Sequence, residues 1–444
     1  MSKKNEQYSL FTAISMIVGI CIGSGIFFKA DDVLRATGGN VTLGVIIFVM
    51  GALGITFGSI SLSELAGISS ASGGVVGFFQ EFISPKASSA FAWFQTFLYL
   101  PTINVVVSWV GGIYTLQILG IDFSLEVATL IGTAYLLFFY GVNYLSMRFG
   151  AAFQSGSTFI KLIPLILIAV LGVLNGQGVS DSSPDTVQMG SSFAWLAALA
   201  PMAFSYDGWT VVLNISPQIK NGKRNVPLAL FIGPLVVLVA YLAYFIGLVT
   251  LLGSEQVLSL GDNAIYTVGK DIFGQYGGIF ITLFILISIL GVSNGMTMGS
   301  IRMPEVLANK QMLPQAFISN DLTLRPAKNS MLLSLVIALV WMAIHYVTQR
   351  YDILKGGDVS ELAITFSYLC YLILYVKILN LRKTGVLKKS FKNSLAPLLG
   401  ILSSLMIFLG SFIAHPVTTV IFIGFCSFVC VLGYLFYQRT ASTD

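Results

Sequence analysis

The chain has 444 residues, of which 56% are hydrophobic, 13% aromatic and only 10% charged. Soluble proteins carry about 25% charged residues, so this composition predicts a protein whose solvent is lipid and excludes a cytosolic enzyme, a secreted disulfide scaffold and a free nucleic-acid-binding domain. At about 20 apolar residues per span, the fold class that we expect is an all-α polytopic membrane protein with short loops.

Twelve apolar segments follow one another, separated by short polar breaks. The polar N-terminus is followed by an apolar run without a small-residue cleavage site, which indicates no signal peptide. Four cysteines, Cys21, Cys370, Cys426 and Cys430, lie in apolar stretches and are predicted to be free thiols. The expected spans lie near residues 9–36, 41–66, 88–118, 125–144, 150–174, 189–216, 226–252, 277–303, 330–348, 359–381, 394–413 and 416–437.

Basic residues gather on alternate connecting segments. With the N-terminus inside, 18 of the 24 Lys and Arg residues fall on inner segments, five on outer ones (Lys29, Arg35, Lys270, Arg350 and Lys355) and one, Lys161, within a span. Short cytoplasmic loops carry an excess of Lys and Arg. We therefore expect a multi-pass protein of the plasma membrane with both termini in the cytoplasm.

Two spans are interrupted by residues that do not suit a helix interior. The first reads VGICIGSGIFFKADD and the sixth reads ALAPMAFSYDGWTVV. Small residues such as Gly23 and Gly25 also suit close helix packing, but interrupted helices at matching positions of two halves indicate an inverted repeat with a binding site near the midplane. This predicts a cytoplasmic segment 1–8, five-helix repeats 9–174 and 189–381, accessory helices in 394–437 and a cytoplasmic tail 438–444.

Unwound backbone at membrane depth must line a cavity, because lipid cannot satisfy its polar groups. Free amides at Ser24, Gly25 and Ile26 begin the outer half of span one and suit a carboxylate. Carbonyls near Cys21 and Phe204 end the preceding half-helices and suit an ammonium group. An α-amino acid carries both charges, so the two breaks predict a site for its backbone.

At these residues the chain resembles the amino acid–polyamine–organocation transporters. The first motif, GSGIF at Gly23–Phe27, and the second, FSYDGW at Phe204–Trp209, are similar to the L-type branch, which includes bacterial serine/threonine and alanine/serine/cysteine exchangers. The resemblance covers the whole length and implies a LeuT-like five-plus-five inverted repeat with discontinuous helices 1 and 6. Further matches are SGG at Ser72–Gly74, KNGKRNVP at Lys220–Pro227, LAYF at Leu242–Phe245 and SNG at Ser293–Gly295 with Arg302 downstream.

The resemblance also implies a set of site residues. Amides of Ser24 and Gly25 would bind the substrate carboxylate, carbonyls of the breaks would take its amino group, and Phe204 would close over it from outside. The sequence departs from the family at Gln218, where relatives often carry glutamate, and at Asp207, which is glycine in many animal members. The predicted substrate-binding residues are Cys21, Gly23, Ser24, Gly25, Ile26, Phe204, Ser205, Asp207, Tyr244 and Asn294.

Lys161 lies about seven residues or more from either end of span five. A lysine at this depth costs about 2.5–3.5 kcal/mol on insertion scales, so it is expected to be functional rather than snorkelling. The resemblance implies that its ammonium replaces the ion that ties span one to span eight in sodium-coupled relatives. We expect Lys161 and Phe204 to act in coupling and gating. Only Glu64, Lys161 and Asp207 are expected to place charge away from loops and span ends.

The predicted function is sodium-independent exchange of neutral L-amino acids by alternating access, without a cofactor or metal. Ser24, Ser205 and Ser293 suggest a small, tolerant pocket, while proton-coupled symport and transport of cationic amino acids or polyamines remain alternatives. An intramembrane protease is disfavoured because the YD at Tyr206–Asp207 lacks a GxGD partner, and a channel or a sensor has no supporting feature. The loop Leu119–Glu126 has no cysteine, so no disulfide-linked heavy chain is expected as a partner.

Overall fold

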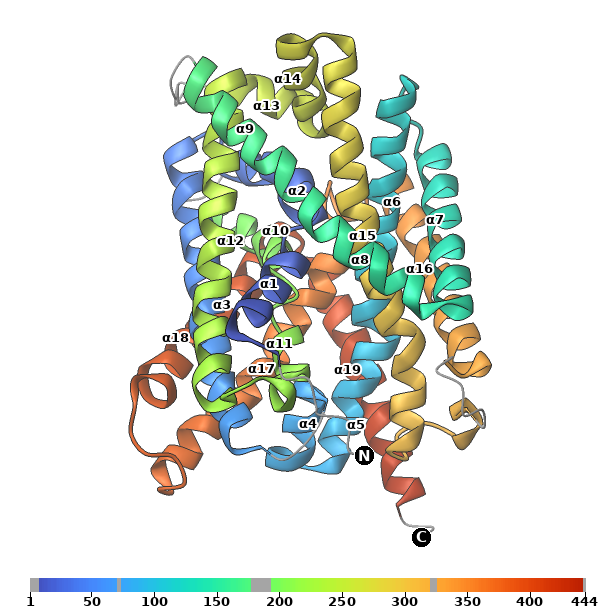
Figure 1. The fold of residues 1–444 in the computed structure, drawn as a ribbon. Coiled ribbons are helices and arrows are strands. Elements are labelled where there is room, and N and C mark those ends of the chain that lie inside the picture. The colour runs from blue at the N-terminus through green and yellow to red at the C-terminus, as the bar shows by residue number, and fades with distance from the viewer. Residues whose placement is uncertain (1–7, 70–72, 177–192, 320–325, 442–444) are drawn as a thin grey trace.

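The structure is a computed structural model, and it describes residues 8–69, 73–176, 193–319 and 326–441. These residues form a bundle of helices, with a single isolated β-bridge between Tyr8 and Ile219. The long helices run roughly parallel to one axis (Figure 1). The predicted all-α fold class is therefore confirmed.

The first part of the chain forms α1 to α9. Several of these helices begin at a Ser or Asn whose side chain accepts a backbone N–H, as at Ser9, Asn40, Ser84, Ser124 and Ser146; such caps satisfy amides that have no partner within the helix. The helices are α1 Leu10–Cys21, α2 Ser24–Ala36, α3 Val41–Ile68, α4 Gly74–Phe78, α5 Pro85–Phe94, α6 Leu100–Leu119, α7 Leu125–Leu145, α8 Met147–Ile160 and α9 Leu162–Asn175, with π-helical turns η1 Phe79–Ile83 and η2 Gln95–Tyr99.

The second part forms α10 to α19. The bounds are α10 Leu199–Ser205, α11 Val211–Asn214, α12 Gly222–Leu252, α13 Ser254–Leu260, α14 Ala264–Phe273, α15 Gln275–Asn309, α16 Lys328–Arg350, α17 Val359–Lys383, α18 Phe391–Ala414 and α19 Pro416–Thr440. Short 3-10 turns are η4 Ala194–Ala198, η5 Ser216–Gln218, η6 Gly261–Asn263 and η7 Gln315–Phe317. Helices α13 and α14 lie at one end of the bundle and α4 and α5 at the other (Figure 1).

Among the described residues, ten helices are long and apolar enough to cross a membrane, and the pair α1 and α2 makes eleven if it counts as one span. The remaining expected span, near 189–216, is represented by the short pieces η4, α10 and α11. The count of twelve from the sequence therefore differs only at the sixth segment, which is too fragmented to count as a single long helix.

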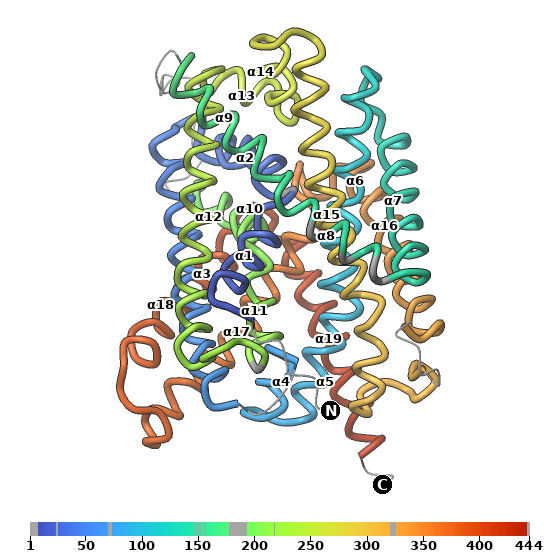
Figure 2. The backbone as a smooth tube through the Cα atoms, viewed as in Figure 1, coloured from blue at the N-terminus to red at the C-terminus, as the bar shows by residue number. Residues whose placement is uncertain are grey.

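Both predicted interruptions are present. Helices α1 and α2 meet at an angle of 57° across the break at Ile22 and Gly23, and a turn of residues 206–210 separates α10 from α11. Gly208 has φ +106°, a backbone conformation that costs glycine little. Span five is also interrupted, because α8 ends directly before Lys161 and α9 begins directly after it. The pair α8 and α9 runs obliquely across the bundle (Figure 2).

Candidate substrate site

The two broken spans meet at their interruptions. A Cβ added to Gly25 would lie 2.6 Å from the Cα atom of Ser205, and one added to Gly208 would overlap the side chain of Ile20. Glycine at both positions therefore allows the two backbones to approach more closely than any other residue would. The two breaks that the sequence predicts therefore lie next to each other in the structure.

Tyr241 of α12 joins the two breaks through its hydroxyl group. The hydroxyl oxygen lies 2.7 Å from the carbonyl oxygen of Cys21 and 2.7 Å from that of Ser205, and it can donate to either. The thiol of Cys21 donates to the carbonyl of Tyr206 at 3.3 Å. The ends of α1 and α10 are thus held by a buried side chain that sequence reasoning did not single out.

A small cavity lies between the breaks. Its volume is about 20 Å³, which is enough for about one water molecule and too little for an amino acid. Five of its lining residues, Cys21, Gly23, Gly25, Phe204 and Asp207, are among the predicted site residues. The full lining is Ile20, Cys21, Gly23, Gly25, Ile103, Val107, Phe204, Asp207, Val292 and Met296.

The other predicted site residues do not line this cavity. Helix α2 begins at Ser24, and Ile26 is fully buried two residues later. The Ser205 hydroxyl donates to the carbonyl of Pro201 at 3.0 Å. Tyr244 packs edge-on against Phe27 with 5.5 Å between ring centroids.

Asn294 is engaged away from the breaks. Its side-chain amide donates to the carbonyl of Gly150 and accepts from Asn143, each at 2.8 Å. The neighbouring Ser293 donates to Asn104 at 3.0 Å. These hydrogen bonds tie α15 to α6, α7 and α8, so both side chains have partners within the protein.

A second cavity, of about 330 Å³, adjoins the first and is lined mainly by residues of η2, α8, α11 and α15. The two share Ile20, Val292 and Met296 as lining residues, and the second continues to Gln95, Gln154 and Asn214. This volume lies at the lower end of the range for ligand pockets, about 300–1,000 Å³. One of its walls is α11, which lies toward the end of the bundle occupied by α4 and α5 (Figure 1), the end predicted to be cytoplasmic.

Tyr99 lies between these two cavities. Its hydroxyl donates to the carboxylate of Asp207, and Tyr99 lines the larger cavity while Asp207 lines the smaller one. The carboxylate of Asp207 therefore has a partner from η2 in this state. The sequence does not distinguish Tyr99 from the other tyrosines among its 18. The position of Tyr99 depends on the π-helical turn that places η2 opposite the second break.

Lys161 reaches the first broken span. The residue is completely buried, and its ammonium donates to the carbonyl of Gly19 near the end of α1. The last four carbonyls of a helix have no partner within the helix, so the lysine satisfies one of them. Among the described residues, no carboxylate lies within ion-pair distance of Lys161.

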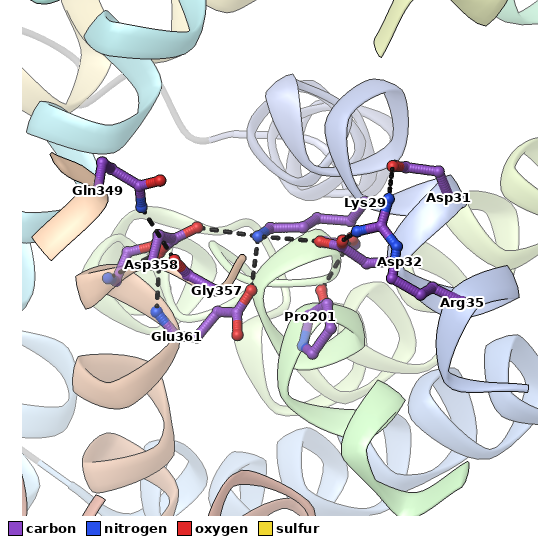
Figure 3. Close-up of polar contacts among 11 residues, drawn as sticks. Lys29, Asp31, Asp32, Arg35, Pro201, Gln349, Gly357, Asp358 and Glu361 are labelled. Atoms are coloured by element: carbon purple, nitrogen blue, oxygen red, sulfur yellow. Dashed lines mark hydrogen bonds and ion pairs between the residues drawn. The ribbon is translucent and has the colours of Figure 1, made fainter. Parts of the chain in front are cut away.

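A second lysine, Lys29, is buried where the charge pattern of the sequence predicts an outer segment. The charge pattern places Lys29 on an outer segment, but the structure buries it completely in α2. Its ammonium lies 2.5 Å from Glu361, 2.9 Å from Asp358 and 3.3 Å from Asp32 (Figure 3). Lys29 also lies 5.8 Å from the centre of the Phe204 ring. Glu64, Lys161 and Asp207 are therefore not the only charges placed away from the surface.

The position of the acidic residues at the start of α17 explains why the sequence does not predict this buried cluster. Asp358 caps the helix, because its Oδ1 accepts from the backbone amides of Ser360 and Glu361. Burial alone would raise the pKa of the Asp358 carboxyl, but the Lys29 ammonium and the hydrogen bonds from Ser360 and Lys29 hold it below its ordinary value. Acidic residues at a helix start are a normal end-of-span pattern, so the sequence alone does not reveal their burial.

The known proteins that this chain resembles are amino acid transporters. The family model described as "Amino acid permease" matches residues 8–442. The chain is 25% identical over 402 residues to the serine/threonine exchanger SteT of Bacillus subtilis (strain 168), covering 90% of this chain and 88% of that protein. It is 26% identical over 446 residues to the human b(0,+)-type amino acid transporter 1, covering 97% and 87%.

A solved structure has the same fold. The crystal structure of MhsT in complex with L-phenylalanine superposes with a TM-score of 0.60 at 16% identity, covering 90% of this chain and 98% of that one. The fold is therefore LeuT-like, as expected from the motifs. The relatives that the sequence matches are transporters and not enzymes. With a family model matched from residue 8 to residue 442, the chain belongs to the amino acid permease family.

Proposed function

We propose that this protein exchanges neutral L-amino acids across the plasma membrane by alternating access, without sodium. The amide ends at Ser24 and Gly25 would bind the substrate carboxylate, and the carbonyl ends at Cys21, Phe204 and Asp207 would bind its amino group. The backbone supplies both partners of a zwitterion, so no ion-pairing side chain is needed. The five-helix repeats 9–174 and 189–381 would carry the two halves of this site.

The observation that carries sodium independence is the contact of Lys161 with Gly19. A buried ammonium already supplies positive charge to the carbonyl of Gly19 near the end of α1, and the family resemblance implies that a cation ties span one to span eight in sodium-coupled relatives. An ion added next to it would meet like-charge repulsion at low dielectric. The lysine therefore serves as a fixed cation.

The two cavities support alternating access. The site cavity is too small for substrate, and it continues toward the predicted cytoplasmic end through the larger cavity. On the other side of the site cavity, the ammonium of Lys29 lies 5.8 Å from the centre of the Phe204 ring. We infer a state closed at the predicted outer end, from which a substrate would leave toward the cytoplasm past Tyr99 and Asp207.

The names of the relatives support the substrate class. One is a serine/threonine exchanger, another is a b(0,+)-type amino acid transporter, and MhsT was solved with L-phenylalanine. The apolar residues Ile103, Val107, Val292 and Met296 line the site cavity, which favours neutral side chains. We propose that the protein acts without a disulfide-linked heavy chain.

Proteoliposomes test this proposal. Vesicles loaded with unlabelled serine or another neutral amino acid should take up the labelled compound in choline buffer as fast as in sodium buffer. Uptake that depends on sodium would contradict the role given to Lys161. A competition panel of twenty amino acids against one labelled substrate would define the accepted side chains, and effective competition by lysine or arginine alone would favour the cationic alternative.

A further inference from the structure

The buried cluster around Lys29 has more negative charge than positive charge. Lys29 and Asp358 form a neutral pair at 2.9 Å. Asp32 is shared with Arg35, whose Nη1 lies 3.3 Å from its Oδ1. This leaves the carboxylate of Glu361, 2.5 Å from the same ammonium and only 4% exposed, without a cation of its own.

The neighbouring groups do not supply the missing positive charge. His345 of α16 is completely buried and packs edge-on against Trp109 at 4.7 Å between ring centroids; neither ring nitrogen has a hydrogen-bond partner within the described part of the chain. His415, between α18 and α19, has its pKa lowered by burial and then by Lys355, so it is neutral at pH 7. Asp31, 3.4 Å from Arg35, and Asp262, whose pKa is raised by burial and then by Asp31, are acids and supply no positive charge.

Glu361 differs from Asp358 in its hydrogen bonds. Asp358 accepts from Ser360, from the amide of Glu361 and from Lys29, and this set stabilises its ionised form. Among the described residues, Lys29 is the one side chain that donates a hydrogen bond to Glu361. Burying an ion without full compensation costs several kcal/mol, and a carboxylate avoids that cost by taking up a proton. Among the three carboxylates around Lys29 (Asp32, Asp358 and Glu361), Glu361 is therefore the one whose protonation costs the least free energy.

The cluster also connects α2 to the start of α17, two elements that must move relative to each other during transport. Lys29 lies on α2, while Asp358 and Glu361 lie at the start of α17, and the three side chains point toward one another between the two helices (Figure 3). If substrate enters from outside, as the proposed function requires, these elements must separate and water must reach the carboxylates. In water each carboxylate is ionised at neutral pH.

We propose that Glu361 is a proton-binding site, distinct from the substrate site, and that it takes up one proton each time the outer end of the transporter closes. The proton comes from the outer side and returns there on opening, because Glu361 lies in the first turn of α17, at the end predicted to be outer, and lines neither the site cavity nor the larger cavity. Acid on the outer side favours the closed state. No net proton movement accompanies exchange through this group.

The sign and size follow from linkage. The closed state binds one more proton than the open state, so the closed-to-open ratio rises up to tenfold for each unit that the outer pH falls. Substrate binds from outside only to the open state, and its apparent dissociation constant grows as the open fraction shrinks. The apparent KM for outer substrate should therefore rise up to tenfold per pH unit, while the pH on the inner side has no such effect.

Hydrogen–deuterium exchange tests the closure without any transport. In wild-type protein, peptides covering residues 24–39 and 354–366 should exchange more slowly at pH 5.5 than at pH 7.5 after correction for intrinsic rates. Glu361→Gln, which imitates the protonated form, should exchange slowly at both pH values. Glu361→Asp should keep the pH dependence, and the matched control Glu126→Gln, an exposed glutamate paired with Arg350 at 3.5 Å, should behave like wild type.

Uptake into proteoliposomes gives the second readout, with inner pH fixed and outer pH varied. Glu361→Gln should lose the dependence of KM on outer pH, and His345→Gln should keep it. Equal corrected exchange at both pH values in wild type, or a pH dependence that survives in Glu361→Gln, would overturn the proposal. If the peptides respond to pH but no amino acid is transported, the proposed substrate is wrong and the proton site stands.

Discussion

Replacing Lys161 by methionine removes a charge while keeping most of the side-chain volume. The ammonium of Lys161 donates to the carbonyl of Gly19, and a hydrogen bond from a charged group contributes about 1.5–3 kcal/mol. At about 1.4 kcal/mol per factor of ten, the position of α1 that this bond stabilises should lose about 10- to 100-fold in population. Exchange should fall by the same range, because α1 carries one side of the substrate site.

Stability should behave differently from transport. Lys161 is completely buried, and desolvation of an ion costs several kcal/mol. Methionine relieves that cost while leaving the Gly19 carbonyl without its donor. The melting temperature of the variant in detergent should therefore equal or exceed that of wild type while exchange is lost. Lys270→Met, at an exposed position of α14, should change neither.

One result would contradict the role given to Lys161. If Lys161→Met keeps wild-type exchange and its melting temperature falls, the lysine acts as a structural tether and not in the transport cycle. If exchange becomes dependent on sodium in the variant, the fixed-cation role is supported directly, since a free ion would then occupy the place of the ammonium.

Two further predictions concern the breaks. Tyr241→Phe removes the hydroxyl that lies 2.7 Å from two carbonyls, so we expect a loss of about 1 kcal/mol in unfolding free energy and slower exchange; Tyr244→Phe should change little, because the Tyr244 hydroxyl has no hydrogen-bond partner among the described residues. Gly25→Ala places a Cβ 2.6 Å from Ser205 Cα, so overpacking of about 1–3 kcal/mol should reduce uptake about fivefold or more, at about 1.4 kcal/mol per factor of ten. Gly156→Ala, where a Cβ meets nothing within 4 Å, is the control.

Features that depend on local sequence were predictable. The low share of charged residues predicts a membrane protein, and the apolar runs predict its spans. The glycines near Gly23 and Gly208 predict both helix interruptions. Each of these properties belongs to a short stretch of chain. The cavity between the breaks also followed, since matching interruptions in two halves must meet. Lys161 was found because it is a charge far from any span end.

Features that depend on which helices meet were not predictable. Lys29 lies a few residues from a span end, so its charge pattern is that of an outer loop, and its burial follows only from the packing of α2 against the start of α17. Tyr99 and Tyr241 are two tyrosines among 18, and their roles follow from the positions of η2 and α12. Asn294 has a polar motif around it, but its partners on α7 and α8 are visible only in three dimensions.

Counterflow in reconstituted proteoliposomes is the decisive test of sodium-independent exchange. Vesicles containing an unlabelled neutral amino acid are diluted into sodium-free choline buffer with the labelled compound outside, at equal pH on both sides. We expect rapid uptake that requires the internal amino acid and does not change when sodium replaces choline. Uptake that requires sodium, or that proceeds equally well into empty vesicles, would contradict it.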